Sequence, residues 1–167
     1  MGFGKAFGFS LLAYIGLNFL FIIIAYTIEG TLNGLFSAIS ANPLMILTIL
    51  FGPVIYFPGE VFTLLVNQFQ LGIVASLLIQ FIGFIVSPFV GALVAGRMGE
   101  NKGGSFGGWF LASVVSGVAM AILAYIEPLM FIPPATTTTM ILVLISGIAM
   151  GIFYGCFALL FTKTEYY

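Results

Sequence analysis

The sequence predicts an all-α integral membrane protein with four transmembrane helices and an amphipathic or re-entrant helical element between the first and second of them. Three observations carry this prediction. Of the 167 residues, 62% are hydrophobic and only 5% are charged, whereas about a quarter of the residues are charged in a soluble globular domain. Four apolar runs, at about 7–28, 71–96, 106–126 and 140–162, are each long enough for a helix to cross the membrane, which takes roughly 20 residues. We therefore expect a single membrane domain, 1–167.

The first apolar run begins just after Lys5. It is too long for the core of a signal peptide, and no small-residue cleavage site follows it, so we expect a retained span. The chain then becomes polar, yet four apolar residues keep the spacing i, i+3, i+4 and i+7 of one helical face. They are Leu32, Leu35, Phe36 and Ile39. This spacing predicts a short amphipathic helix at the membrane surface.

A further apolar run, Leu44 to Phe57, is too short to span the membrane. Gly52 and Pro53 interrupt it, and Pro58 closes it. A run of this length is typical of a re-entrant or interfacial segment. We therefore expect a re-entrant or interfacial element at about 32–58, with a fifth full span as the alternative.

The placement of charge supports four spans over five. Cytoplasmic loops near the ends of spans concentrate lysine and arginine. If the four long runs each cross once and the short run does not, every basic residue lies on one side: Lys5, Arg97, Lys102 and Lys163. The acidic residues Glu29, Glu60 and Glu127 then lie outside, and Glu100 and Glu165 lie inside. We expect a multi-pass protein of the cell membrane with both termini in the cytoplasm.

Small residues recur at every fourth position in three of the spans. The clearest series is Gly147, Gly151 and Gly155, and shorter series are Ala92 with Gly96 and Ser113 with Gly117. A helix face without bulky side chains lets another helix approach closely, which is how helices associate in lipid. We predict that these faces pack against helices, either of the same chain or of a neighbouring subunit.

Two groups of polar residues could carry a function. Asn18 and Gln80 lie near the centres of the first and second spans, so they are predicted to form an intramembrane polar pair, either as packing contacts or as part of a solute path. Glu60 comes shortly after the short apolar run, and three amide residues come after Glu60: Asn67, Gln68 and Gln70. Channels and transporters build sites from broken helices, so these four could form a pore or solute site. The alternative is a set of solvated interfacial side chains.

The chain lacks residues that enzymes commonly use for catalysis. The chain has no histidine, and Cys156 is its only cysteine, which we expect to be a small buried apolar residue. The commonest metal ligand and general base are therefore missing, and we expect no enzyme activity, metal or cofactor. A formal charge of −1 leaves no basic surface for nucleic acid. No predicted span contains a charge, which argues against ion-coupled transport.

One stretch resembles known proteins. Residues 87–97 read SPFVGALVAGR, a short charged loop follows, and residues 104–108 read GSFGG. This stretch, at about 87–108, is similar to a glycine-rich hairpin in small uncharacterised archaeal and bacterial multi-span membrane proteins. The resemblance implies a tight helical hairpin and brings no established activity.

The leading functional hypothesis is a non-catalytic accessory or structural subunit of a larger membrane complex that packs through its small-residue faces. Its partners would be the lipid bilayer and other membrane subunits or further copies of itself. The alternative is a small permease, channel or membrane-embedded substrate-binding component for a neutral solute.

Overall fold

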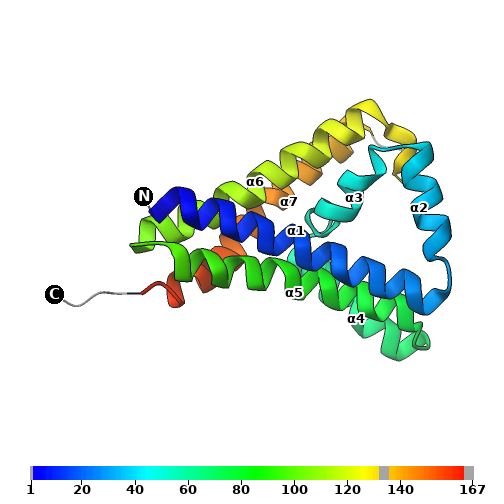
Figure 1. Ribbon diagram of the computed structural model, residues 1–167, viewed down its shortest axis with the longest axis horizontal. Helices are drawn as coiled ribbons and strands as arrows, with labels where there is room; N and C mark the ends of the chain where they lie inside the picture. The colour runs from blue at the N-terminus through cyan, green and yellow to red at the C-terminus, as the bar shows by residue number, and fades with distance from the viewer. Residues whose placement is uncertain (1, 132–135, 164–167) are drawn as a thin grey trace.

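The computed structural model describes residues 2–131 and 136–163, and the described part is helical without a β-strand (Figure 1). Four helices are long and apolar enough to cross a membrane: α1 (Gly2–Glu29), α5 (Ala75–Met98), α6 (Lys102–Ile126) and α7 (Thr137–Leu160). The predicted all-α membrane fold with four spans is confirmed. Glu165, expected inside, lies outside the described residues.

Two spans begin at a capping or turn residue rather than at the start of the predicted apolar run. α6 begins at Lys102, before the predicted 106, because the side chain of Asn101 accepts a hydrogen bond from the Gly104 N–H at 2.7 Å. α5 begins at Ala75, after the predicted 71, because Gly72 has a φ of 113° and separates it from the preceding helix. Hydrophobicity locates a span, whereas capping and turn residues set its ends.

The spans α1 and α5 run in opposite directions. A Cβ built on Gly83 of α5 would meet Phe21 of α1, and one built on Gly91 would meet Tyr14. The residue number of the partner on α1 falls from 21 to 14 as the residue number on α5 rises from 83 to 91, so the two helices are antiparallel. The chain between them therefore leaves and re-enters the bundle at the same end, and the segment at 32–74 makes no additional crossing.

The four spans form a bundle that is closed at one end and splayed at the other. All four converge near the N-terminus, at what we call the terminal end, and α1 with α5 diverges from α6 with α7 toward the opposite, distal end (Figure 1). The helix α2 (Leu32–Ala41) lies at the distal end. Of its predicted apolar face, Leu35 is buried and packs among core residues, whereas Phe36 is 48% exposed.

The predicted glycine face of α7 packs against α6. A Cβ on Gly147 would lie 3.1 Å from the Cα of Gly117, and the Ser113 hydroxyl donates a hydrogen bond to the Gly147 carbonyl at 2.7 Å. Phenylalanine rings of α6 cover Gly151 and Gly155. The glycines bring the two backbones into contact within one chain, so this face is not available to a neighbouring subunit.

The second small-residue series brings α5 against α7. Ala92 is fully buried, and a Cβ on Gly96 would lie 2.6 Å from the carbonyl oxygen of Ala158. The expectation that Cys156 is buried was wrong: it is exposed on the outer face of α7. Gly155 and Ala158 take the inward positions of that turn, and Cys156 therefore points away from the bundle.

Candidate functional site

The candidate site surrounds a helical hairpin that enters the splayed bundle from the distal end. Its inward arm is α3 (Met45–Phe51) followed by the short helix η1 (Gly52–Ile55), and its outward arm is α4 (Pro58–Leu71). The two arms bend by 93°. Proline has no N–H and interrupts the hydrogen bonding of a helix, so Pro53 and Pro58 lie where the helix breaks. The structure thus has a bent helix pair between the first and second spans, and this pair extends to Leu71, beyond the predicted limit of 58.

Three side chains of the spans bind carbonyl groups of the hairpin. Carbonyls at a helix break lack intrahelical donors, and leaving them unpaired at membrane depth costs several kcal/mol each. The three hydrogen bonds run from Asn18 Nδ2 to the Ile49 carbonyl at 2.5 Å, from Ser146 Oγ to the Tyr56 carbonyl at 2.9 Å, and from the Tyr14 hydroxyl to the Phe51 carbonyl at 3.5 Å. The hairpin is thus fixed to both α1 and α7.

The proline in the hairpin explains why the carbonyl of Ile49 needs a donor from another helix. In a continuous helix the carbonyl of Ile49 would accept the N–H of the residue four positions later. That residue is Pro53, which has no N–H. The amide of Asn18, fully buried, supplies the missing donor.

The predicted pair of Asn18 and Gln80 does not form. The amide of Asn18 bonds to the hairpin backbone instead. Gly83 of α5 lies opposite Phe21, so the antiparallel register places Gln80 nearer the distal end than Asn18. The prediction assumed that residues near the centres of the two apolar runs lie at the same depth, and it did not allow for this offset between the helices.

An inner cavity of about 160 Å³ lies between α1, α2, α3 and α5. Three uncharged polar side chains, Gln80, Tyr26 and Tyr56, line it and make no side-chain hydrogen bond within the described part of the chain. Its other lining residues are Ile22, Leu35, Met45, Thr48, Ile49, Gly52, Ile55 and Phe84. The cavity is therefore apolar with a few free hydrogen-bonding groups and no charge.

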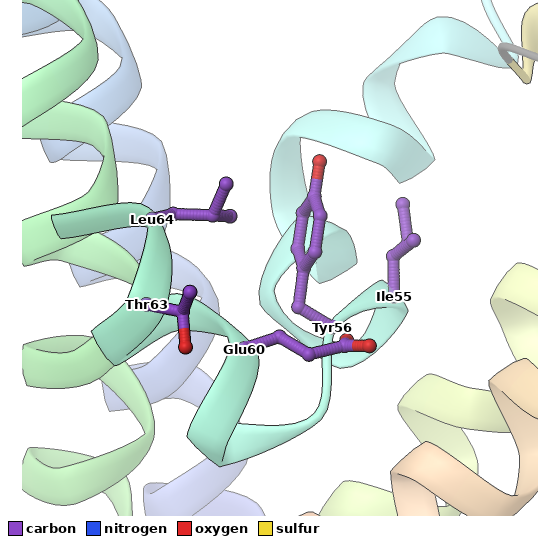
Figure 2. Close-up of a pocket in the computed structure, with 5 residues that line it drawn as sticks. All are labelled: Ile55, Tyr56, Glu60, Thr63 and Leu64. Carbon is purple, nitrogen blue, oxygen red and sulfur yellow. The ribbon is translucent and has the colours of Figure 1, made fainter. Parts of the chain in front are cut away.

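A second hollow, the outer cleft, lies between η1 and α4 and has a volume of about 490 Å³. Figure 2 shows Leu64 and Tyr56 on opposite sides of it, with Glu60 reaching below the ring. The cleft opens on the surface of the bundle, because Glu60 and Thr63 are exposed. Ile55 and Tyr56 line both hollows and thus form the wall between them.

The structure does not bring the four predicted residues of a pore or solute site together. Glu60 lines the outer cleft, but Asn67, Gln68 and Gln70 line neither hollow. Gln68 accepts a hydrogen bond from the Val74 N–H at 3.2 Å, so it stabilises the turn between α4 and α5. The predicted site was too large, because it grouped residues that are close in sequence. Asn67, Gln68 and Gln70 lie near the distal end of α4, away from the hairpin tip where Glu60 lies.

Several residues of the site were not singled out from the sequence. Tyr14 and Tyr56 lie inside apolar runs, where a tyrosine is easily taken as a bulky apolar residue. The ring of Tyr56 stacks on Phe84 of α5, with 5.6 Å between centroids. The signal that could have identified the donors is Pro53, since a proline within a membrane helix leaves a carbonyl that another side chain must satisfy.

Three buried polar atoms have no hydrogen-bond partner in the described part of the protein: Asn18 Oδ1, Ser87 Oγ and Trp109 Nε1. The Trp109 ring makes edge contacts with Tyr14 and Tyr154, with centroids 5.9 and 6.3 Å away. Of these three, Asn18 adjoins the inner cavity, because a Cβ on the cavity residue Gly52 would lie 3.9 Å from its amide nitrogen.

A glycine face of α1 that the sequence analysis did not single out lies open. No described residue would lie within 4 Å of a Cβ on Gly4 or Gly8. Together with Lys5, Phe9 and Leu12, these glycines line a groove of about 300 Å³. The small-residue faces predicted to pack are occupied within the chain, whereas no residue of the described ranges 2–131 and 136–163 covers this one.

No family model, curated protein or solved structure matches this chain. The resemblance of the hairpin at 87–108 therefore stays a prediction.

Proposed function

We propose that this protein is a membrane-embedded binding component for a small, neutral and largely apolar solute, with the inner cavity as its site. The observation that carries the proposal is the inner cavity itself, which lies beside a helix break and has apolar walls and a few free polar groups. Binding sites for small molecules have this composition, and membrane transporters place them beside broken helices.

The size and lining of the cavity restrict the solute. A volume of about 160 Å³ holds a molecule about the size of five waters. Its lining has no charged side chain, so an ion would lose its hydration without gaining a counter-ion. The amide of Gln80 can both donate and accept hydrogen bonds. A compact neutral molecule with one or two polar atoms fits this site.

Changing Gln80 to leucine tests this proposal. We expect a panel of small neutral alcohols and amides, measured in lipid nanodiscs, to contain a molecule that raises the unfolding temperature of the wild type. In Gln80→Leu its affinity should fall about three- to tenfold, because one hydrogen bond contributes about 0.5–1.5 kcal/mol. Gln70→Leu is the matched control, since Gln70 is exposed on α4 and lines neither hollow. Equal loss in both variants, or no binder at all, would contradict the inner cavity as a site.

The proposed orientation places both termini in the cytoplasm of a cell-membrane protein. Its support is that α1 begins and α7 ends at the terminal end of the bundle, where the loop between α5 and α6 also lies. The four basic residues of the chain therefore lie at one end of the bundle: Lys5, Arg97, Lys102 and Lys163. Basic residues next to spans concentrate on the cytoplasmic side. The hairpin and both hollows then open toward the outer leaflet.

A second candidate function, an accessory subunit that packs against another membrane helix, is favoured by the open groove at Gly4 and Gly8. Small residues four apart allow close helix contact in lipid. We expect Gly8→Ile to reduce the yield of cross-linked complexes in native membranes several-fold. Gly16→Ile is the control, because Gly16 is on the same helix and a Cβ built on it would also meet no described residue within 4 Å. An unchanged yield in Gly8→Ile would exclude this groove as the contact.

A further inference from the structure

The carboxylate of Glu60 lies near the middle depth of the bundle. The peptide group between Tyr56 and Phe57 fixes this depth, because its carbonyl accepts from Ser146 Oγ at 2.9 Å and its N–H donates to Glu60 Oε2 at 2.8 Å. Ser146 is about 14 Å along α7 from the distal start of the helix and about 21 Å from its other end, at 1.5 Å per residue. The carboxylate is one peptide group away from that position.

This depth differs from that of a solvated interfacial side chain, which is the alternative that the sequence left open for Glu60. The sequence places Glu60 at the end of a short apolar run, and the end of a surface segment would be at the interface. In the structure that run, α3 with η1, leads inward from the distal end, and α4 leads back out. The end of the run is therefore the tip of the hairpin and its deepest point.

No basic side chain of this protein balances the charge of Glu60. All four lysine and arginine residues lie at the terminal end, and none forms an ion pair with Glu60 within the described residues. A charged side chain at membrane depth is costly, and such residues mark sites for ligands, ions or protons. Glu60 Oε2 bonds to the backbone, whereas Oε1 has no protein donor in the part of the chain that the structure describes and can accept one from a ligand.

The residues that line the outer cleft restrict which cations could balance the charge of Glu60. Apart from Glu60, the only polar side chains in the lining are Tyr56 and Thr63, and the hydroxyl of Thr63 donates to the Gly59 carbonyl at 3.2 Å. A calcium ion needs six to eight oxygen ligands, so this lining suits it poorly. A phospholipid headgroup stays at the interface, about 15 Å from the midplane of the hydrocarbon.

We infer that the outer cleft binds a lipophilic amine in its ammonium form. The ammonium group donates hydrogen bonds to Glu60, and the hydrocarbon part lies between Tyr56 and Leu64, on opposite walls of the cleft (Figure 2). The face of the Tyr56 ring adds a favourable contact for a cation. A volume of about 490 Å³ accommodates an amine with an aromatic or alkyl tail. This site lies across the Ile55 and Tyr56 wall from the inner cavity, so it does not depend on the proposed solute site.

The test compares 4-phenylbutylamine with its neutral analogue 4-phenylbutanol. Saturable binding is measured at neutral pH to the full chain in nanodiscs of zwitterionic lipid, with empty nanodiscs subtracted. We expect the amine to bind the wild type at least about tenfold more tightly than the alcohol, and Glu60→Gln to remove this preference. Glutamine can still cap the first turn of α4, so the variant should fold, and an unchanged unfolding temperature verifies this.

Glu29→Gln is the matched control, because Glu29 is an exposed carboxylate at the distal end of α1. It should bind the amine as tightly as the wild type. Equal affinity for amine and alcohol would overturn the inference, since apolar partitioning alone would then account for binding. A preference for the amine that survives in Glu60→Gln would overturn it as well, and so would complete displacement of the amine by millimolar calcium.

Discussion

Replacing Gly96 with alanine is expected to lower the free energy of unfolding by about 2–3 kcal/mol. The new Cβ would lie 2.6 Å from the carbonyl oxygen of Ala158 and 3.2 Å from the backbone of Phe161. Both contacts are with backbone atoms, so no side chain can rotate away and α5 must move from α7. Inserting atoms into a packed interior typically costs 1–3 kcal/mol. Reversible unfolding in mixed micelles measures the change.

Gly16→Ala is the control for Gly96→Ala. A Cβ on Gly16 would have no neighbour within 4 Å in the described part of the chain, and alanine is the better helix former by about 1 kcal/mol. This variant should therefore be as stable as the wild type or slightly more stable. If both alanine variants unfolded at the same denaturant concentration, the close contact between α5 and α7 would be contradicted.

Replacing Asn18 with leucine is expected to release the re-entrant hairpin. Leucine has nearly the size of asparagine but donates no hydrogen bond, so the Ile49 carbonyl would lose the partner that replaces the missing N–H of Pro53. A buried unpaired carbonyl costs about 1–3 kcal/mol. We expect a loss of stability of this size, and faster maleimide labelling of a cysteine placed at Val54, which is fully buried in the wild type. The exposed Cys156 is first changed to serine to give a background without thiols.

Ser116→Ala separates the loss of an interhelical donor from the loss of any buried hydroxyl. Ser116 is fully buried, and its hydroxyl donates to the Ala112 carbonyl of its own helix at 2.8 Å. That carbonyl keeps its helical partner when the hydroxyl is removed, so the cost should stay below about 1 kcal/mol and labelling at position 54 should not change. Equal labelling rates in Asn18→Leu and Ser116→Ala would contradict the anchoring role of Asn18.

The hairpin explains why both hollows occur in one region. Ile55 and Tyr56, at its tip, line the inner cavity and the outer cleft together. Their positions depend on the hydrogen bonds that Asn18 and Ser146 make to the hairpin backbone. We therefore expect a variant that releases the hairpin to lose binding at both sites, whereas Gln80→Leu and Glu60→Gln should each affect one site only.

The sequence by itself determined the membrane class of this protein, its four spans and the presence of a short broken segment between the first two. Each of these properties is local: a long apolar run has one low-energy environment, and Pro53 and Pro58 lack the N–H that a continuous helix through them would need. The small-residue faces at Gly147 and Gly96 could also be predicted as packing surfaces, because a missing side chain permits close approach.

Only the tertiary structure decided which groups meet. The register of α1 against α5 separates Asn18 from Gln80, and the return of the hairpin to the distal end places Glu60 at its tip, near the middle of the length of α7. The same packing leaves Gly4 and Gly8 open while it covers Gly147. A sequence specifies the face and the span of each residue, but depth and partner depend on how the helices slide and turn against one another, since apolar faces of similar composition permit many registers.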